Sequence, residues 1–381
     1  MAAVLLALFY IISPIIILYL CKKFSLLNKI GAVLLAYATG LVLGNIGILP
    51  DNAEQVQNIM TTITIPLAIP LLLFSANIKT WFTMAGKTML SMVIALVSVV
   101  IVVFVGFFIF KGEIKELWKI GGLLVGLYSG GTPNLASIKM ILNVDPEAFI
   151  ITHTFDMLIS AIYLLFLLTI GQKVFWYFLP KYKALYKTTH HSGQDLSFTN
   201  YWGFWHKKYR LPLLAALGIS VFIFGIAGGL SFLVPDNSQM VVVILTITTL
   251  GIISSFIPKI NKIAKTFDLG MYLILIFSVV IASMADIEKF NGSAPELLAY
   301  ISFVIFGALF LHVLFSRLFK IDADTVMVTS TALICSPPFV PVIAGAIKNK
   351  EIIISGLTVG IIGYAVGNYL GFFVAEMLKF M

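Results

Sequence analysis

The sequence is poor in charged residues and in cysteine. Charged side chains make up 11% of the 381 residues, whereas a soluble domain carries roughly 25%. The two cysteines, Cys21 and Cys335, are far apart, which excludes a disulfide framework and a zinc motif. The sequence also lacks a nucleophile elbow and a phosphate-binding glycine loop, so we expect neither an enzyme nor an organic cofactor. The net charge of +8 suits basic cytoplasmic loops, and no nucleic-acid partner is expected.

In place of charge, the sequence has long apolar segments. Hydrophobic residues make up 60% of the chain, and most apolar segments reach the roughly 20 residues that a membrane-spanning helix needs. The nearly uncharged windows are 3–21, 30–50, 57–78, 88–110, 120–138, 148–171, 211–235, 239–258, 269–285, 297–316, 325–347 and 352–375. We therefore predict an all-α polytopic protein of the cytoplasmic (inner) membrane, in contact with membrane lipid and with 11 to 13 crossings.

A long basic stretch divides these windows into two equal sets. It predicts three parts: a first transmembrane repeat (1–171), a basic connecting loop (172–208) and a second transmembrane repeat (209–381). Both sets have a break in their fifth window, and the prolines Pro133 and Pro341 of the two breaks are 208 residues apart. Paired breaks at corresponding positions of two halves indicate the substrate and ion site of a transporter.

Loop charge indicates that the two repeats have opposite orientations in the membrane. Basic residues gather in the loops near Lys22 and Lys79 in the first half, but in the connecting loop and near Lys262 in the second. The positive-inside rule then puts the amino terminus outside and the connecting loop inside, which makes the repeats inverted. Six crossings that start outside would also end outside, so either one more pass is present or one window does not cross.

The first break, at 128–137, is rich in polar side chains, and the second, at 336–341, is rich in proline. Glycine and proline interrupt a helix, and the freed backbone groups bind ions or solutes when they line a cavity. A kinked core helix is the alternative. The candidate substrate-binding residues are Ser129, Gly130, Gly131, Thr132, Pro133 and Asn134 in the first break, Ser336, Pro337 and Pro338 in the second, and Asn77, Asp286 and Asn368 elsewhere. Asn77 and Asp286 end corresponding windows, where they either line the site or only meet water at the interface.

Asp156 is the only carboxylate deep inside any of the windows. A charge at such depth costs about 3 kcal/mol or more, so it usually faces a cavity and marks an ion or proton path. Thr152 lies one helical turn before it and shares its face. Oxygen ligands suit a hard cation such as sodium, while a desolvated carboxylate could instead carry a proton. The alternative is a structural aspartate that caps an amide of the broken helix.

Two short patterns resemble known carriers. The run Gly130–Asn134, followed by an oxygen-rich helix, resembles the pattern of bacterial sodium/bile acid symporters. The opening, from Lys22–Leu27 through Gly40 and Gly44 to Leu49–Asp51, resembles the first two helices of cation/proton antiporters. The whole chain looks most like the DUF819 family of membrane proteins, which is grouped with both.

The resemblance implies a mobile core with two crossed broken helices that moves against a dimerisation domain. Carried over by position, together with the hydroxyl of Ser137 at the break, the sodium ligands would be Thr132, Asn134, Ser137, Thr152, Thr154 and Asp156. The symporters' glutamate and glutamine have no counterpart at 336–341, which puts a second sodium site in doubt. Phe155 stands where the antiporters have a second acidic or amide residue, which weakens a pure antiporter interpretation.

We therefore predict a homodimeric secondary active transporter that moves a small organic solute, expected to bear a carboxylate. Sodium or protons would drive it by alternating access. A monovalent cation/proton antiporter is the alternative, and a membrane-embedded enzyme or a sensor is a third hypothesis from a different class. Solute-independent exchange of protons for cations would separate the antiporter from the symporter.

Overall fold

The computed structural model describes residues 2–24, 27, 31–50, 52–75, 86–182, 207–285, 294–349 and 351–381. All regular secondary structure in these ranges is helical. Nine of the described helices are long and apolar enough to cross a membrane. The prediction of an all-α polytopic membrane protein is confirmed at this level, and the connecting loop lies mostly outside the described residues.

The helices of the first half follow the order of the apolar windows. They are α1 (Ala2–Lys23), α3 (Ala32–Asn45), α4 (Ala53–Phe74), α6 (Gly86–Phe110), the pair α7 (Leu117–Gly130) and α8 (Thr132–Leu142), and a long helix formed by α9 (Pro146–Phe166), the π-helical turn η1 (Leu167–Gly171) and α10 (Gln172–Phe178). Helix α3 is shorter than a typical membrane span, which takes about 20 residues.

The second half has a similar order of helices. They are α11 (Lys207–Ser231), α12 (Asp236–Ser255) with the short α13 (Pro258–Asn261), α14 (Thr266–Ser283), α15 (Ala294–Leu318), α16 (Ala323–Ser330) with the π-helical turn η3 (Thr331–Cys335), the short η4 (Pro337–Phe339) with α17 (Val340–Ala346), and α18 (Ile353–Lys379).

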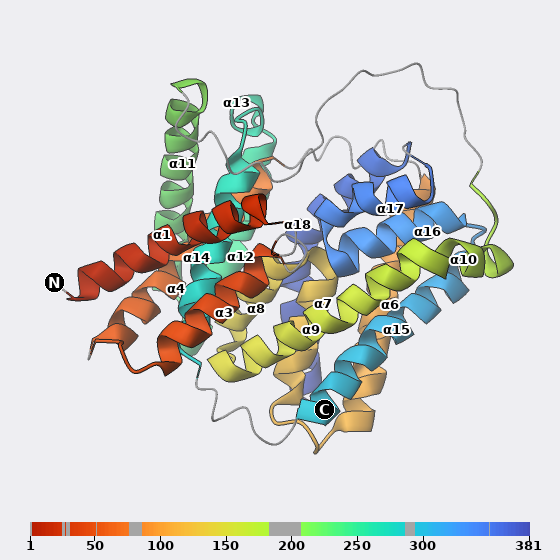
Figure 1. The fold of residues 1–381 in the computed structure, drawn as a ribbon, viewed down its shortest axis with the longest axis horizontal. Helices are drawn as coiled ribbons and strands as arrows, with labels where there is room; N and C mark the ends of the chain where they lie inside the picture. Colours follow the sequence, from red (N-terminus) through yellow and green to blue (C-terminus); the bar gives the residue numbers. More distant parts are fainter. Residues whose placement is uncertain are drawn as a thin grey trace.

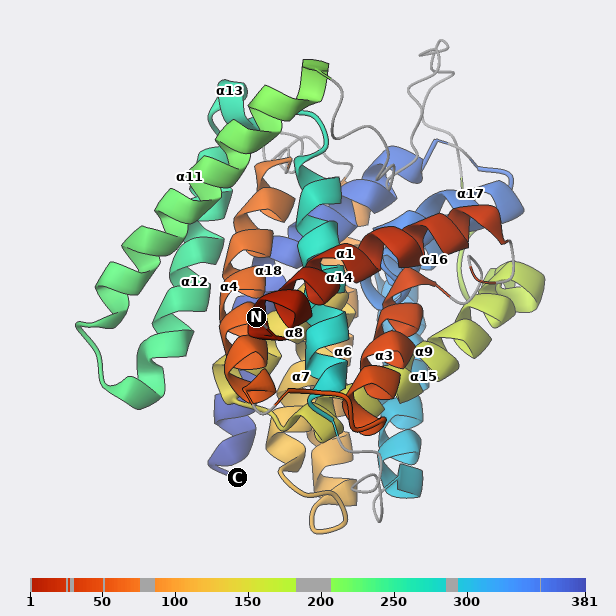
Figure 2. The same cartoon turned by 60° about the vertical axis from the view of Figure 1, so that its left-hand side comes forward.

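The helices form two groups that meet along α8, α9 and α18 (Figure 1). The first group contains α1, α3 and α4 from the first half, and α11, α12 and α14 from the second. Figure 2 shows α11 and α12 as an outer pair beside α4. The second group contains α6, α7, α9, α15 and α16–α18, which surround the two breaks. Since the breaks lie in the second group, the candidate site does too.

The first break is the tip of a helical hairpin, in which α7 and α8 run side by side in opposite directions. A Cβ atom on Gly126 would lie 2.9 Å from Ile138, and one on Gly122 would lie 3.1 Å from Leu142. At the open end, Lys119 Nζ donates to the carbonyl oxygen of Asn143 at 3.2 Å. From one pair to the next, both members lie farther from Gly131 along the sequence, as expected for the two arms of a hairpin. We call this element, residues 117–142, hairpin 1.

The second break is also a hairpin tip. Val328 and Val340, which lie before and after the break, both contact the same glycine of α18, Gly356. At the open end, Asn349 Nδ2 donates to Asp324 Oδ2 at 3.0 Å, which joins the start of α16 to the residues after α17. We call residues 323–346 hairpin 2.

The sequence correctly located both breaks, but the expectation of two crossed broken helices is wrong in its geometry. At the breaks, Gly131 has φ 79° and ψ −163°, and Ser336 has φ 83° and ψ 155°. This conformation reverses the chain, whereas a proline kink in the helix would let it continue in nearly the same direction. Each fifth segment therefore returns to the side from which it started.

Candidate functional site

The tips of the two hairpins touch each other. A Cβ atom on Gly131 would lie 2.6 Å from the hydroxyl oxygen of Ser336, so any larger residue at this point of hairpin 1 would displace the serine side chain. The contact brings together the two sets of substrate-binding candidates, Ser129–Asn134 and Ser336–Pro338, which are about two hundred residues apart in sequence. The meeting point of the hairpins is therefore the candidate site.

Helix α18 runs directly against the tip of hairpin 1. A Cβ atom on Gly363 would overlap the carbonyl oxygen of Ser129, and one on Gly367 would overlap the side chains of Ser129 and Asn134. The Asn134 amide donates from Nδ2 to the Gly363 carbonyl oxygen at 3.0 Å. Asn134 is almost fully buried, and this bond fixes the tip to α18.

Sequence reasoning missed the role of α18. Its glycines Gly356, Gly360, Gly363, Gly367 and Gly371 recur at intervals of three or four, which places them on one face of a helix. All of them contact one or other hairpin in the structure. The same spacing was readable in the sequence, and small residues on one face are typical of close helix packing in membranes.

Asp156 lies in α9 directly behind the tip of hairpin 1. Its Oδ1 accepts hydrogen bonds from Tyr128 Oη at 2.8 Å and from Ser160 Oγ at 3.1 Å. The side chain is buried, and no lysine or arginine among the described residues forms an ion pair with it. Because an unpaired buried carboxylate is costly, this group calls for a proton or a cation.

The six candidate sodium ligands lie on two neighbouring elements, with Thr132, Asn134 and Ser137 on α8 and Thr152, Thr154 and Asp156 on α9. Thr152 Oγ1 donates to the Ala148 carbonyl oxygen at 2.6 Å, and Ser137 Oγ donates to the Pro133 carbonyl oxygen at 2.8 Å, each within its own helix. Thr154 is half-buried on α9. The described residues contain no cluster of three or more His, Cys, Asp or Glu side chains that could hold a metal.

His153, which is not among the predicted site residues, also reaches the tip of hairpin 1. Its Nδ1 is 2.6 Å from Tyr37 Oη, and its ring packs edge-on against Tyr37 with centroids 5.4 Å apart. Its Nε2 is 3.5 Å from Thr132 Oγ1. His153 therefore links the first helix group, through Tyr37 of α3, to hairpin 1.

The remaining candidates are placed differently. Asn368 is fully buried and donates from Nδ2 to Thr248 Oγ1 of α12 at 3.0 Å, so its side chain faces the first helix group and not the tips. Pro337 packs against Gly360 of α18. Pro338 adjoins it in η4, where both prolines remove N–H donors from the start of the helix. Asn77 and Asp286 lie outside the described residues.

Comparison with known proteins gives a family and a relative. The sequence pattern of the DUF819 family, described as a protein of unknown function, matches residues 7–381. The chain is 25% identical over 374 residues to an uncharacterized membrane protein, YjcL, of Bacillus subtilis (strain 168), and the match covers 93% of this chain and 91% of that protein. The chain therefore belongs to the DUF819 family of membrane proteins, as the sequence predicted.

Proposed function

We propose that this protein is a secondary active transporter that moves a small organic solute across the cytoplasmic membrane. The observation that carries the proposal is the contact between Gly131 and Ser336 at the two hairpin tips, with the buried Asp156 one hydrogen bond behind the first tip. Interrupted segments that meet inside a membrane bundle are the usual place for a solute and its coupling ion. Asp156 is the proposed carrier of the coupling charge, whether sodium or a proton.

Contacts between helix ends support a topology with five crossings and one hairpin in each half. On one side, Lys111 Nζ bonds to the Met381 carbonyl oxygen at 2.7 Å. On the other side, Lys87 Nζ bonds to the Lys320 carbonyl oxygen at 3.4 Å. These bonds place the end of α6 beside the carboxyl terminus, and its start beside the end of α15. The amide of Ala323, at the base of hairpin 2, donates to the carbonyl oxygen of Pro180 just after α10.

Under this topology hairpin 1 enters from the side of both termini and hairpin 2 enters from the opposite side. The two halves then have opposite orientations, which removes the difficulty of six crossings. Packing supports the same relation. By their order in each half, α1 and α3 correspond to α11 and α12, and α4 corresponds to α14. Helices α1 and α3 pack on α14, just as α11 and α12 pack on α4. This exchange of equivalent partners is what a pseudo-two-fold axis in the membrane plane would produce.

Charge supports an orientation with both termini outside the cytoplasm. Basic residues dominate the side that carries the base of hairpin 2: Lys22, Lys23, Lys87, Lys181, Lys208, Arg210, Lys259, Lys262, Lys265, Arg317, Lys320 and Lys348. The opposite side has several acidic residues: Glu54, Glu113, Glu116, Asp145, Glu147, Asp236, Glu296 and Glu376. By the positive-inside rule, hairpin 2 opens toward the cytoplasm.

The chemistry of the tips supports an anionic group and a cation as ligands. Helix α8 begins at Thr132, so its amino-terminal end points into the site and would favour a carboxylate of the solute. Helix α7 and the turn η3 both end at the tips, where their last carbonyl groups would favour a cation. A carboxylate-bearing solute with sodium would satisfy both ends.

A monovalent cation/proton antiporter is the second candidate. It is favoured by one observation: Asp156 has no basic partner among the described residues, so proton and cation could compete for it directly. An antiporter would exchange the two ions without any organic solute.

The deciding experiment uses the purified protein in proteoliposomes with imposed sodium or proton gradients. A thermal-shift screen of organic anions with and without sodium first selects a solute, because a ligand stabilises the native state by mass action. We expect gradient-driven uptake of that solute. Cation/proton exchange that proceeds without the solute would favour the antiporter, and the absence of both activities would contradict the proposal.

The protein is also proposed to be a homodimer. The early helices of each half, away from the breaks, are proposed to form the interface. Of these, α1 and α11 in the first group present many exposed apolar side chains, including Leu5, Ile16, Leu214 and Phe222. A dimer through this group would leave hairpins 1 and 2 free to move. Single-molecule photobleaching in lipid bilayers would count the subunits, and a monomer would contradict this part of the proposal.

A further inference from the structure

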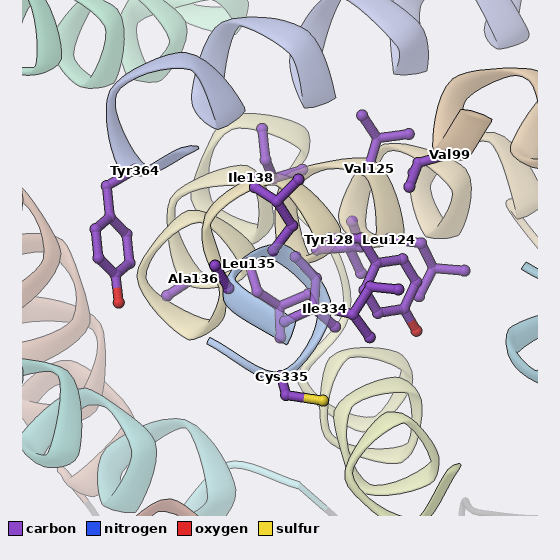
Figure 3. Packing of buried hydrophobic residues seen from close by; sticks show 14 of the residues in the cluster. Val99, Leu124, Val125, Tyr128, Leu135, Ala136, Ile138, Ile334, Cys335 and Tyr364 are labelled. Carbon is purple, nitrogen blue, oxygen red and sulfur yellow. The ribbon is translucent and has the colours of Figure 1, made fainter. Parts of the chain in front are cut away.

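A small cavity lies behind the hairpin tips, at the junction of α6, α15 and both hairpins. The space that the centre of a water-sized sphere can occupy is about 10 Å³. This volume is close to the minimum that one water molecule needs. Its lining residues are all buried: Ala95, Val99, Tyr128, Ala308, His312, Ser330, Leu333 and Ile334. Figure 3 shows Tyr128 of hairpin 1 beside Ile334 of hairpin 2, with Val99 on the adjoining helix.

One buried nitrogen of His312, a residue that lines this cavity, lacks a hydrogen-bond partner among the described residues. His312 Nε2 is 2.9 Å from Ser91 Oγ, but His312 Nδ1 has no partner within the described part of the chain. The His312 side chain is 1% exposed, so bulk water does not reach this nitrogen. Buried polar groups are rarely left unpaired, and an internal water molecule is the usual partner when the protein supplies none.

Two other polar groups line the same cavity. Tyr128 donates its hydroxyl hydrogen to Asp156 Oδ1, so its oxygen can still accept a hydrogen bond. Ser330 Oγ forms a hydrogen bond with Tyr163 Oη of α9. A water molecule in this space would therefore have His312, Tyr128 and Ser330 around it, and buried waters typically make about three hydrogen bonds.

We propose that one water molecule occupies this cavity and joins His312 to the Tyr128–Asp156 pair. This inference deepens the proposed function and rests on it, because it makes His312 part of the network that holds the coupling charge on Asp156. The network would extend from α9 through hairpin 1 to α15, and so would connect elements from both halves of the chain.

The test measures contact between water and His312 by solid-state nuclear magnetic resonance in lipid bilayers. The chain has five histidines, so ¹⁵N-histidine labelling gives few signals, and His312→Gln identifies the one that disappears. We expect magnetisation transfer from water protons to His312 Nδ1. Ala308→Val adds two methyl groups to the cavity wall and should abolish that transfer. Ala299→Val makes the same change at an exposed position of the same helix and should leave it intact.

A second measurement tests the link to Asp156. Asp156→Asn changes the acceptor of the Tyr128 hydroxyl, so the ¹⁵N shifts of His312 should change. Unchanged shifts, or no transfer from water in the wild-type protein, would overturn the inference. Neither readout needs a transported solute. If these measurements fail but gradient-driven uptake is found, the water site is wrong and the proposed function stands. If water contacts His312 but no transport is found, the water site stands and the proposed function fails.

Discussion

The tips of hairpins 1 and 2 have almost the same backbone conformation but different residues at the turn. Hairpin 1 turns at Gly131, and hairpin 2 turns at Ser336, with φ values of 79° and 83°. Only glycine adopts this backbone conformation with almost no strain, and for a residue with a side chain the strain is of order 1–3 kcal/mol. Since hairpin 2 keeps a serine at such a cost, we infer that its hydroxyl group has a task at the site. Its position against Gly131 points to ligand binding at the contact of the tips.

The side chains around the two tips also differ, and those of hairpin 1 are more polar. The tip of hairpin 1 carries Thr132 and Asn134, and Tyr128 ties it to Asp156. The tip of hairpin 2 carries two prolines, and the residue before Ser336 is the apolar Cys335. Under the proposed function, the two hairpins would therefore have different roles. Hairpin 1 would supply the polar ligands, and hairpin 2 would supply shape and a single hydroxyl.

The largest expected effect comes from Asp156→Asn. We predict that this change abolishes ion-driven accumulation of the solute while the protein still folds, because the amide keeps the shape and can still accept from Tyr128 and Ser160. Uptake in proteoliposomes with an imposed gradient measures it. Asp236→Asn, at an exposed helix start, is the matched control and should transport normally. Wild-type accumulation by the Asp156→Asn protein would place the coupling site elsewhere, with Asp286 the next candidate.

Gly131→Ala should be the most damaging change at the turns. The added methyl group would strain the backbone and press on Ser336 Oγ, so we expect a loss of about 1–3 kcal/mol in the stability of hairpin 1. Thermal unfolding in detergent, with Gly218→Ala in the open part of α11 as a control, measures this loss. An unchanged melting temperature would show that the contact between the tips is looser than the structure indicates.

Asn134→Ala should have a comparable effect on folding and, in addition, a clear effect on binding. It removes the hydrogen bond to the Gly363 carbonyl oxygen and leaves that oxygen unpaired, at a cost of about 1–3 kcal/mol. Ion and solute binding should weaken together, because linked ligands affect each other reciprocally. Calorimetric titration of solute at several sodium concentrations tests this. A change in solute affinity with unaltered sodium dependence would separate Asn134 from the ion site.

Ser336→Gly should give the smallest change in stability, and in the opposite direction. Glycine relieves the backbone strain, so the protein should become more stable by up to about 1 kcal/mol, while transport falls because the hydroxyl group is lost. Parallel melting and uptake measurements compare this variant with Ser336→Ala, which keeps the strain and also loses the hydroxyl. Full transport by both variants would mean that the serine has no task at the site.

The sequence located the breaks and Asp156 because each depends on a local signal. Glycine and proline interrupt a helix wherever they occur, and a carboxylate in an apolar window stands out without any structure. The direction of the chain after each break was not readable, because a kink and a reversal differ in the dihedral angles of one residue. The place of His312 at the cavity was not readable, because the other residues that line the cavity lie far away in sequence. The glycine face of α18 was readable from its spacing, but its partners were not, because both hairpins lie elsewhere in the sequence.

The reversal of the chain within each half also bears on how such a protein can arise by gene duplication. With five crossings in addition to the hairpin, each half under the proposed topology passes the membrane an odd number of times. A second copy joined to the first must then insert upside down, without any added helix. The ancestral half would have had to be stable in both orientations, and two such halves facing each other would already have brought two chain reversals together at mid-membrane.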